Sequence, residues 1–238
     1  MCGRFTLTTP KIETLSELLR ARLDVRLQEL HRPRFNIAPG TVTALITGQQ
    51  DLRRLEPGLW GLPGPFAGSN IHINARSETV ASSPAFRDAF ARGRCGVLAD
   101  GFYEWSGPRS QRLPLWFHPR DPGPLVLGAI YRDEADPATG EVVRRFAILT
   151  TRANATLAPY HERMPVILPL PALDRWLAGD VRGVADLLGP RATTCWSPPR
   201  WARASTTSAP TTPNASPRAD RHGSWQITSN TPGSTSLQ

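Results

Sequence analysis

The second residue of the chain is a cysteine, in the opening stretch Met1-Cys2-Gly3-Arg4-Phe5. Removal of the initiator methionine would make Cys2 the amino-terminal residue, with an amine and a thiol on adjacent carbons. That pair condenses with an aldehyde to an imine and then to a thiazolidine ring, which an internal cysteine cannot do. The α-amine, with a pKa of about 8, is partly neutral at physiological pH, and Arg4 predicts a thiolate at Cys2. The alternative is an unreactive cysteine on a frayed terminus.

Three later segments carry further side chains suited to chemistry. Asn74 and Arg76 follow a short apolar stretch, where a loop can present them to a ligand. Glu104 ends an apolar run and has aromatic neighbours, and apolar walls raise a carboxyl pKa toward neutrality. His161 and Arg163 precede the strand-like residues 166–168. Each has a structural alternative: Asn74 could cap a turn, Glu104 could pair with an arginine, and His161 could be a surface histidine.

Five motifs connect these segments: MCGR at 1–4, NIAP at 36–39, NARSE at 74–78, ADGFYEW at 99–105 and HERMP at 161–165. In this order they resemble the SOS response-associated peptidase family, also called abasic-site processing proteins, and the resemblance runs from residue 1 to about 188. It implies covalent capture of abasic sites in single-stranded DNA by Cys2 after removal of Met1, in the DNA damage (SOS) response. It further implies an active-site set of Asn74, Arg76, Glu104 and His161. A Schiff base at C1′ acidifies the neighbouring carbon, so a lyase activity by β-elimination is also expected, together with peptidase self-processing.

The chemistry of an abasic sugar suggests a role for each side chain. The sugar exists mostly as a closed hemiacetal, so a catalyst must help open the ring and then remove water from the carbinolamine. We expect Glu104 to act as general acid and base at the carbinolamine, and His161 to protonate the sugar oxygen during opening. Asn74 can orient the Cys2 amine or a sugar hydroxyl through its paired donor and acceptor.

Basic and aromatic side chains supply candidates for DNA binding. Arg4, Arg76 and Arg163 are expected to bind phosphate, because guanidinium groups match its geometry. Trp60 and Trp105 could stack on bases or wedge the strand, with packing in the core as the alternative. The formal charge is +8, from 28 basic and 20 acidic residues, and Lys11 is the only lysine. This agrees with a nucleic-acid partner, although a GC-rich genome also favours arginine.

Length and composition predict the general class of the protein. The 238 residues are 39% apolar, which suits one globular domain with an adequate core. No apolar run approaches the roughly 18 residues of a membrane span, and no signal segment is evident. The three cysteines have neither a CxxC pair nor zinc-site spacing, which predicts a reduced cytoplasmic compartment without a structural metal or cofactor. Cys95 is expected to pack as a buried apolar residue, and a monomer suffices for the mechanism.

The pattern of elements predicts an α+β fold, a single domain with a largely antiparallel, barrel-like β-sheet flanked by a few helices. Helices are expected from Pro10 at the first helical position, with apolar residues through Leu23 on one side, from Ser83-Pro84 to Gly93, and over 172–178. Strands are expected at 42–47, 97–105, 114–118, 125–131, 145–151 and 165–168.

The carboxyl-terminal segment departs from the family pattern. Residues 1–190 are expected to form the catalytic domain, and 191–238 an atypical, basic, Ser/Thr/Pro-rich tail without stable structure. This tail has five arginines and one acidic residue, or +4 of the total charge. A frameshift is one explanation, because GC-rich codons for residues 201–213 can spell a family-like ending one base out of phase. The alternative is a natural basic tail that assists DNA binding.

Two other function classes stay open. Cys2 with Glu104 and His161 could serve a cysteine-type peptidase of the N-terminal-nucleophile style. Alternatively, Arg76, Arg163 and Trp105 would suffice for a non-covalent reader of single-stranded or modified DNA. Only a denaturant-resistant complex separates the covalent mechanism from the reader.

Overall fold

The computed structural model describes residues 2–48, 52–65, 70–108, 110, 112–120, 123–136, 139–191 and 200–201. Within these ranges the α-helices are α1 (Ile12–Leu18), α2 (Val25–Leu30), α3 (Arg87–Arg92) and α4 (Leu173–Ala178), with short 3-10 turns at Leu170–Ala172 and Ala185–Leu188. The strands in the first half are β1 (Arg4–Leu7), β2 (Arg22–Leu23), β3 (Arg34–Ile37), β4 (Val42–Thr47), β5 (Arg54–Trp60), β6 (Leu62–Pro63), β7 (Ile71–His72) and β8 (Asn74–Arg76). Those in the second half are β9 (Arg94–Ala99), β10 (Gly101–Ser106), β11 (Leu113–Phe117), β12 (Leu125–Ala135), β13 (Val142–Arg152), β14 (Arg163–Pro165), β15 (Ile167–Leu168) and β16 (Arg200–Trp201).

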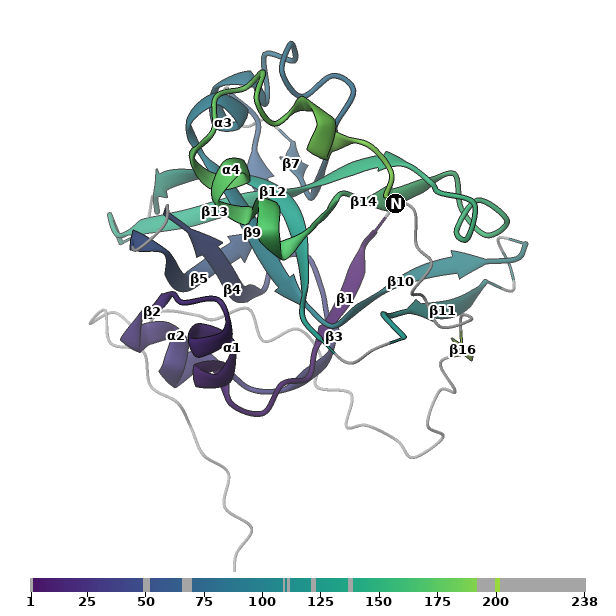
Figure 1. The fold of residues 1–238 in the computed structure, drawn as a ribbon, viewed down its shortest axis with the longest axis horizontal. Helices are drawn as coiled ribbons and strands as arrows, with labels where there is room; N and C mark the ends of the chain where they lie inside the picture. The colour runs from purple at the N-terminus through teal and green to yellow at the C-terminus, as the bar shows by residue number, and fades with distance from the viewer. Residues whose placement is uncertain are drawn as a thin grey trace, which may run out of the picture.

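Five strands close into a barrel at the centre of the molecule (Figure 1). Strand β13 pairs with β12, β12 with β9, β9 with β4 and β4 with β5, all antiparallel, and β5 returns to β13 in parallel. Every residue of β9 is buried, because one face lines the barrel core and the other is covered by helices. The predicted α+β fold with a largely antiparallel, barrel-like sheet is therefore confirmed.

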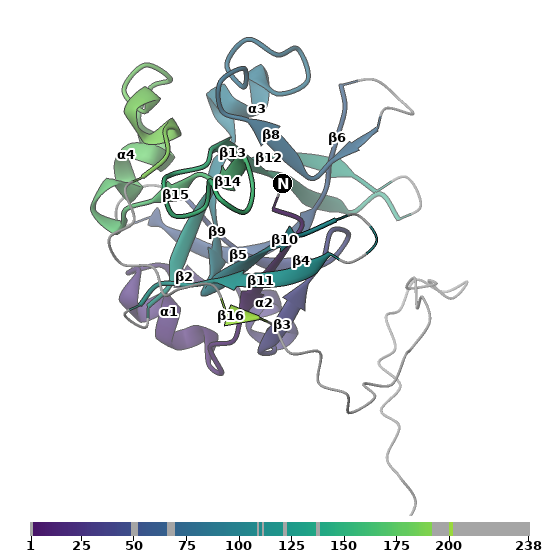
Figure 2. The same cartoon turned by 90° about the vertical axis from the view of Figure 1, so that its right-hand side faces the viewer.

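A second sheet, in the order β16-β11-β10-β1-β3, positions the amino end of the chain. Strand β1 lies between β10 and β3, and both pairings are antiparallel. In two perpendicular views the amino end of β1 points toward β14 (Figures 1 and 2). The polypeptide thus brings its second residue next to strands that lie about 100 and about 160 residues further along the sequence.

The helices lie at opposite ends of the barrel, α1 and α2 at one end and α3 and α4 at the other (Figure 2). A buried arginine, Arg94 of β9, fastens the second pair. Its guanidinium donates to the carbonyl oxygens of Phe90 and Trp176, each at 2.7 Å, and also to that of Gly179. Since these carbonyls end α3 and α4, one cation satisfies acceptors that both helices leave free.

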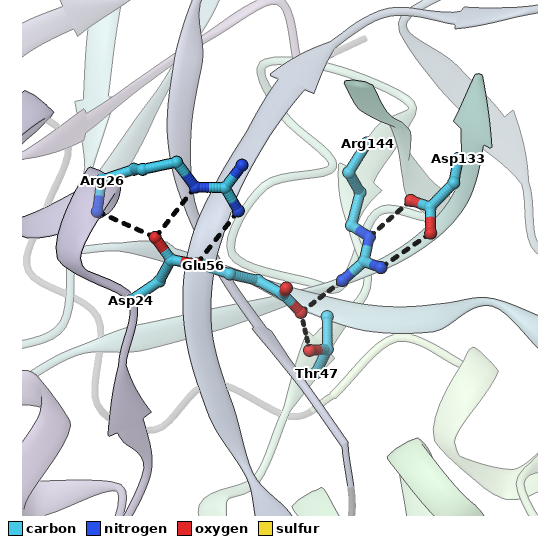
Figure 3. A network of polar contacts seen from close by, with 6 residues as sticks. All are labelled: Asp24, Arg26, Thr47, Glu56, Asp133 and Arg144. Atoms are coloured by element: carbon cyan, nitrogen blue, oxygen red, sulfur yellow. Dashed lines mark hydrogen bonds and ion pairs between the residues drawn. The ribbon is translucent and has the colours of Figure 1, made fainter. Parts of the chain in front are cut away.

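A network of charged side chains braces the place where the barrel closes (Figure 3). Arg144 of β13 donates to both carboxylate oxygens of Asp133 on β12, at 2.7 and 2.8 Å, and also to Glu56 on β5. Thr47 of β4 donates to the same Glu56 carboxylate. The Arg144 guanidinium also lies 4.3 Å from the ring centre of Tyr131. These contacts connect four of the five barrel strands and leave Arg144 with a full set of partners, so the network is structural.

Several predicted element boundaries are wrong. The first helix begins at Ile12 rather than Pro10, and Leu23 belongs to β2 instead of that helix. The second begins at Arg87, although it ends at Gly93 as expected. The predicted strand 97–105 is two strands in different sheets, because the chain turns at Asp100. The segment 165–168 is likewise divided between β14 and β15. Helix α2 and the strands β1, β2, β3, β5, β6, β7 and β8 were not predicted, and Asn74 and Arg76 lie on β8 rather than in the expected loop.

Other expectations concern the cysteines, the tail and membrane spans. Cys95 is fully buried among apolar residues, as predicted. Cys195 and almost all of the proposed tail lie outside the described residues, apart from Arg191 and the β16 pair that adds to the edge of β11. No helix in the described ranges combines the length and the apolar character that crossing a membrane requires.

Candidate active site

The site is built around Cys2, which lies two residues before the start of β1. The residue is completely buried, and its Sγ lies 3.8 Å from the carbonyl oxygen of Arg4. Its own carbonyl oxygen accepts a hydrogen bond of 3.0 Å from Nδ2 of Asn74. The backbone of Cys2 is therefore held by a side chain from a distant strand, and its sulfur lies within the protein.

The ionisation state of Cys2 differs from the sequence expectation. Burial raises the pKa of the thiol strongly, and the nearby negative charge of Glu104 raises it further. The Arg4 guanidinium donates to the carbonyl oxygen of Gly3 at 2.8 Å. The prediction that Arg4 favours a thiolate is therefore wrong, because desolvation and Glu104 hold the sulfur as a neutral thiol.

Glu104 lies on β10, where alternation turns it to the interior while Tyr103 and Trp105 face the other side. Its side chain is only 2% exposed. Burial raises the pKa of the Glu104 carboxyl, against the positive charges of the chain's amino terminus and of His161. A buried carboxyl with a raised pKa can hold a proton at a higher pH than an exposed glutamate, as the apolar run in the sequence predicted.

His161 faces Glu104 from the loop that precedes β14. Its Nε2 lies 3.9 Å from Oε2 of Glu104, and its Nδ1 lies 2.9 Å from the backbone nitrogen of Arg163. A backbone N–H only donates, so in the tautomer in which Nδ1 accepts it the ring proton resides on Nε2 and faces the carboxyl group. In the other tautomer Nδ1 donates to the carbonyl oxygen of Arg163, which lies 3.1 Å away.

Asn74 comes from β8, which pairs in parallel with β13. While Nδ2 donates to Cys2, the Oδ1 atom is buried and has no hydrogen-bond partner among the described residues. A buried amide oxygen without a donor is costly, which makes Oδ1 available to an N–H or O–H group that enters the site. Arg76 lies two residues further on the same strand face. Its side chain is exposed, and no contact to another described residue occupies its guanidinium.

The other residues predicted to contact DNA differ in their exposure to solvent. Arg4 and Trp105 are partly exposed, and the Trp105 ring lies 6.5 Å from that of Tyr103. Trp60 is only 1% exposed and packs against Phe5 and Phe146, and its Nε1 donates to a backbone carbonyl. The expectation that Trp60 stacks on bases is therefore wrong, and its alternative of core packing holds.

Arg163 has a protein partner that the sequence analysis did not identify. Its guanidinium donates to both carboxylate oxygens of Glu78, at 2.6 and 2.9 Å, and to the carbonyl oxygen of Thr150 at 2.5 Å. This pair lowers the pKa of Glu78. Glu78 is the last residue of the NARSE motif, and its negative charge was the feature of the sequence that could have indicated a partner for Arg163. Phosphate binding by Arg163 would require it to exchange one of these partners.

Together, the fold and the site define an α+β barrel protein with a buried cysteine at position 2, beside a carboxyl group, a histidine and an asparagine from three other segments. The family model described as SOS response associated peptidase (SRAP) matches residues 1–204, and the chain belongs to this family. The abasic site processing protein YedK of Escherichia coli is 29% identical over 184 residues, which cover 77% of this chain and 82% of that protein. YoqW of Bacillus subtilis, named in the same way, is 31% identical over 184 residues, covering 74% and 80%.

Solved structures share the fold. A protein from Bacteroides thetaiotaomicron superposes with a TM-score of 0.71 at 25% identity, covering 82% of this chain and 90% of that one. A phage-related protein from Bordetella bronchiseptica gives a TM-score of 0.62 at 28% identity, covering 84% and 94%.

Proposed function

We propose that this protein processes abasic sites in DNA, and that it does so by covalent capture through Cys2 after removal of Met1. The observation that carries the proposal is the convergence of Asn74, Glu104 and His161 on a buried residue 2. The family and the names of its relatives support the same class of activity. The preference for single-stranded DNA and the lyase and self-processing activities are part of this proposal.

The reaction follows from the groups present. The freed α-amine of Cys2 adds to the C1′ aldehyde of the open sugar, and the carbinolamine loses water to give an imine. The thiol sulfur then adds to the imine carbon, and the thiol proton passes to the nitrogen, which closes the thiazolidine. Glu104 supplies and accepts protons at the carbinolamine, while the Nε2–H of His161 serves the sugar oxygen during ring opening.

Asn74 and Arg76 position the reactants in this scheme. Oδ1 of Asn74 can accept a hydrogen bond from the new amine or from a sugar hydroxyl, since no described group occupies it. Arg76 leaves the same face of β8 toward solvent, where its guanidinium can bind a phosphate next to the lesion. Trp105 offers a partly exposed ring for a neighbouring base.

The test is intact-protein mass spectrometry before and after incubation with a single-stranded oligonucleotide that carries one abasic site. We expect a chain without Met1 and a denaturant-resistant adduct that weighs one water less than the sum of its components. Cys2→Ala keeps an α-amine but no thiol, so it should form an adduct only when borohydride reduces the imine. Reversible binding alone would favour the non-covalent reader, and turnover of an unrelated peptide would favour the peptidase.

A further inference from the structure

Asp100 occupies the single residue between β9 and β10, where the chain leaves the barrel and enters the second sheet. Its carboxylate accepts hydrogen bonds from the side chain of Thr6 and from both the backbone nitrogen and the hydroxyl of Thr8, the last two at 2.5 Å. Its backbone nitrogen donates to the carbonyl oxygen of Thr6 at 2.9 Å. Asp100 therefore holds the far end of β1 through four hydrogen bonds.

Trp116 and Gly101 also help to position the Thr6 hydroxyl that donates to Asp100. The indole Nε1 of Trp116 donates to the Thr6 hydroxyl at 3.2 Å, and that hydroxyl has two acceptors, the Asp100 carboxylate and the carbonyl oxygen of Gly101 at 3.2 Å. The indole fits there because residue 101 is glycine: a Cβ at Gly101 would lie 2.2 Å from Nε1. No ion pair joins Asp100 to another described residue, so hydroxyl and amide donors alone satisfy its charge.

The register that Asp100 holds is the one that sets Cys2 against Glu104. The pairing of β1 with β10 comprises Arg4 with Tyr103, Phe5 with Phe102, and Thr6 with Gly101. Glu104 lies on β10, and Cys2 lies two residues before the start of β1, so the register of β1 sets where Cys2 meets β10. A slip of one residue would move Cys2 by about 3.3 Å along β10 and reverse which side chains face the interior. Strand β1 has only four residues, and its pairing with β3 on the other side is interrupted by a register shift between Phe5 and Leu7.

We propose that Asp100 is a positioning residue for the reaction of Cys2, because it fixes the register of β1 against β10. The inference rests on the proposed function, because the crosslinking rate is one of the quantities that test it. Asp100 does not touch the reacting atoms. It acts through Thr6 and Thr8, at the opposite end of the strand from the thiol.

The test compares Asp100→Asn with the unchanged full-length chain. The amide replaces one acceptor oxygen by an NH₂ group, which faces donors and cannot accept from them. With saturating abasic oligonucleotide, we expect the crosslinking rate to fall at least about tenfold, since small misplacements of reacting groups are costly. The Kd for an intact oligonucleotide of the same sequence should stay within about twofold, and the pH profile should keep its shape at a lower plateau.

Two controls separate positioning from general damage. Asp88→Asn makes the same change on exposed helix α3 and should leave the rate unchanged. Thr8→Val removes one hydroxyl donor but keeps the backbone N–H, so it should give a smaller loss of rate in a folded chain. Labelling of Cys2 by a thiol reagent, followed by peptide mass mapping, should be faster in Asp100→Asn than in Asp88→Asn at equal Tm.

The outcomes are distinct. An unchanged crosslinking rate and unchanged Cys2 labelling in both Asp100→Asn and Thr8→Val would overturn the inference, as would a parallel loss of intact-DNA binding. If the unchanged chain forms no adduct, the proposed function fails, and the labelling comparison still decides whether Asp100 positions Cys2.

Discussion

At the scale of single residues, the site divides proton transfer between two groups of different character. Glu104 is buried with a raised pKa, and His161 directs its Nε2 toward that carboxyl while its Nδ1 contacts the backbone of Arg163. The thiol of Cys2 remains protonated beside them. The amine, rather than the sulfur, is therefore expected to attack first, and the thiol proton remains available for the nitrogen when the ring closes.

Glu104→Gln should slow crosslinking by about 100-fold or more, the usual contribution of a general acid–base group. Single-turnover rates at saturating abasic oligonucleotide measure this. The variant should still bind intact DNA with an unchanged Kd. A crosslinking rate equal to that of the unchanged chain would remove Glu104 from the mechanism.

The same substitution should change stability with pH. Because burial raises the pKa of Glu104, the unfolded chain loses this proton first as pH rises through about 4.3. The unfolding free energy therefore falls from that pH up to the folded-state pKa. Glutamine cannot ionise, so Glu104→Gln should match the unchanged chain near pH 4 and melt about 2–4 °C higher at pH 7. Thermal unfolding at both pH values checks the sign, and a lower Tm at pH 7 would contradict it.

At the scale of elements, the join between β9 and β10 determines how the sheets meet. Gly101→Ala would place a methyl group against the Trp116 indole, which is itself packed and hydrogen-bonded. We expect a loss of about 1–3 kcal/mol in unfolding free energy, the usual cost of overpacking. Gly123→Ala is the control, since no atom lies within 4 Å of its added Cβ. Urea denaturation measures both, and equal midpoints would show that the indole moves aside freely.

The elements also show what sequence patterns can and cannot predict. Strand β4 has the predicted bounds, and the helix stops at Gly93 and Gly179 follow from local chemistry. The break falls at Asp100-Gly101, a dipeptide that marks turns, but the apolar residues on both sides of it favour one continuous strand. Strand β5 contains Pro57 and Gly58, which favour a turn, and it forms because β4 and β13 pair with it. Long-range pairing of this kind is absent from local patterns.

The motifs predicted which residues lie together in the candidate site, while the roles of these residues stay predictions. Asn74, Glu104 and His161 meet near Cys2 as expected, because each belongs to a short motif with a recognisable side chain. The wrong predictions concern the surroundings of a side chain, that is, its burial and its partners. Burial turned Trp60 into a core residue and Cys2 into a neutral thiol, and Glu78 engaged Arg163. Such partners depend on which strands become neighbours.

At the scale of the whole molecule, we propose that residues 1–190 form the catalytic unit and that the part of the tail beyond residue 201 is dispensable for the reaction. Every residue assigned to the chemistry lies between positions 2 and 163. Because β16 pairs with β11, the truncation that tests this proposal retains Trp201. A chain that ends there should crosslink within about twofold of the full-length rate at saturating DNA. Loss of crosslinking with an unchanged Tm would assign the tail a direct role.

The burial of Cys2 also bears on how the protein withstands oxidants. Peroxides attack the thiolate and reach exposed sulfur first. A neutral, fully buried thiol presents neither the reactive thiolate nor an exposed sulfur. The conditions that damage DNA oxidatively should therefore leave this cysteine reduced, so that its capacity to react persists until an aldehyde is brought into the site.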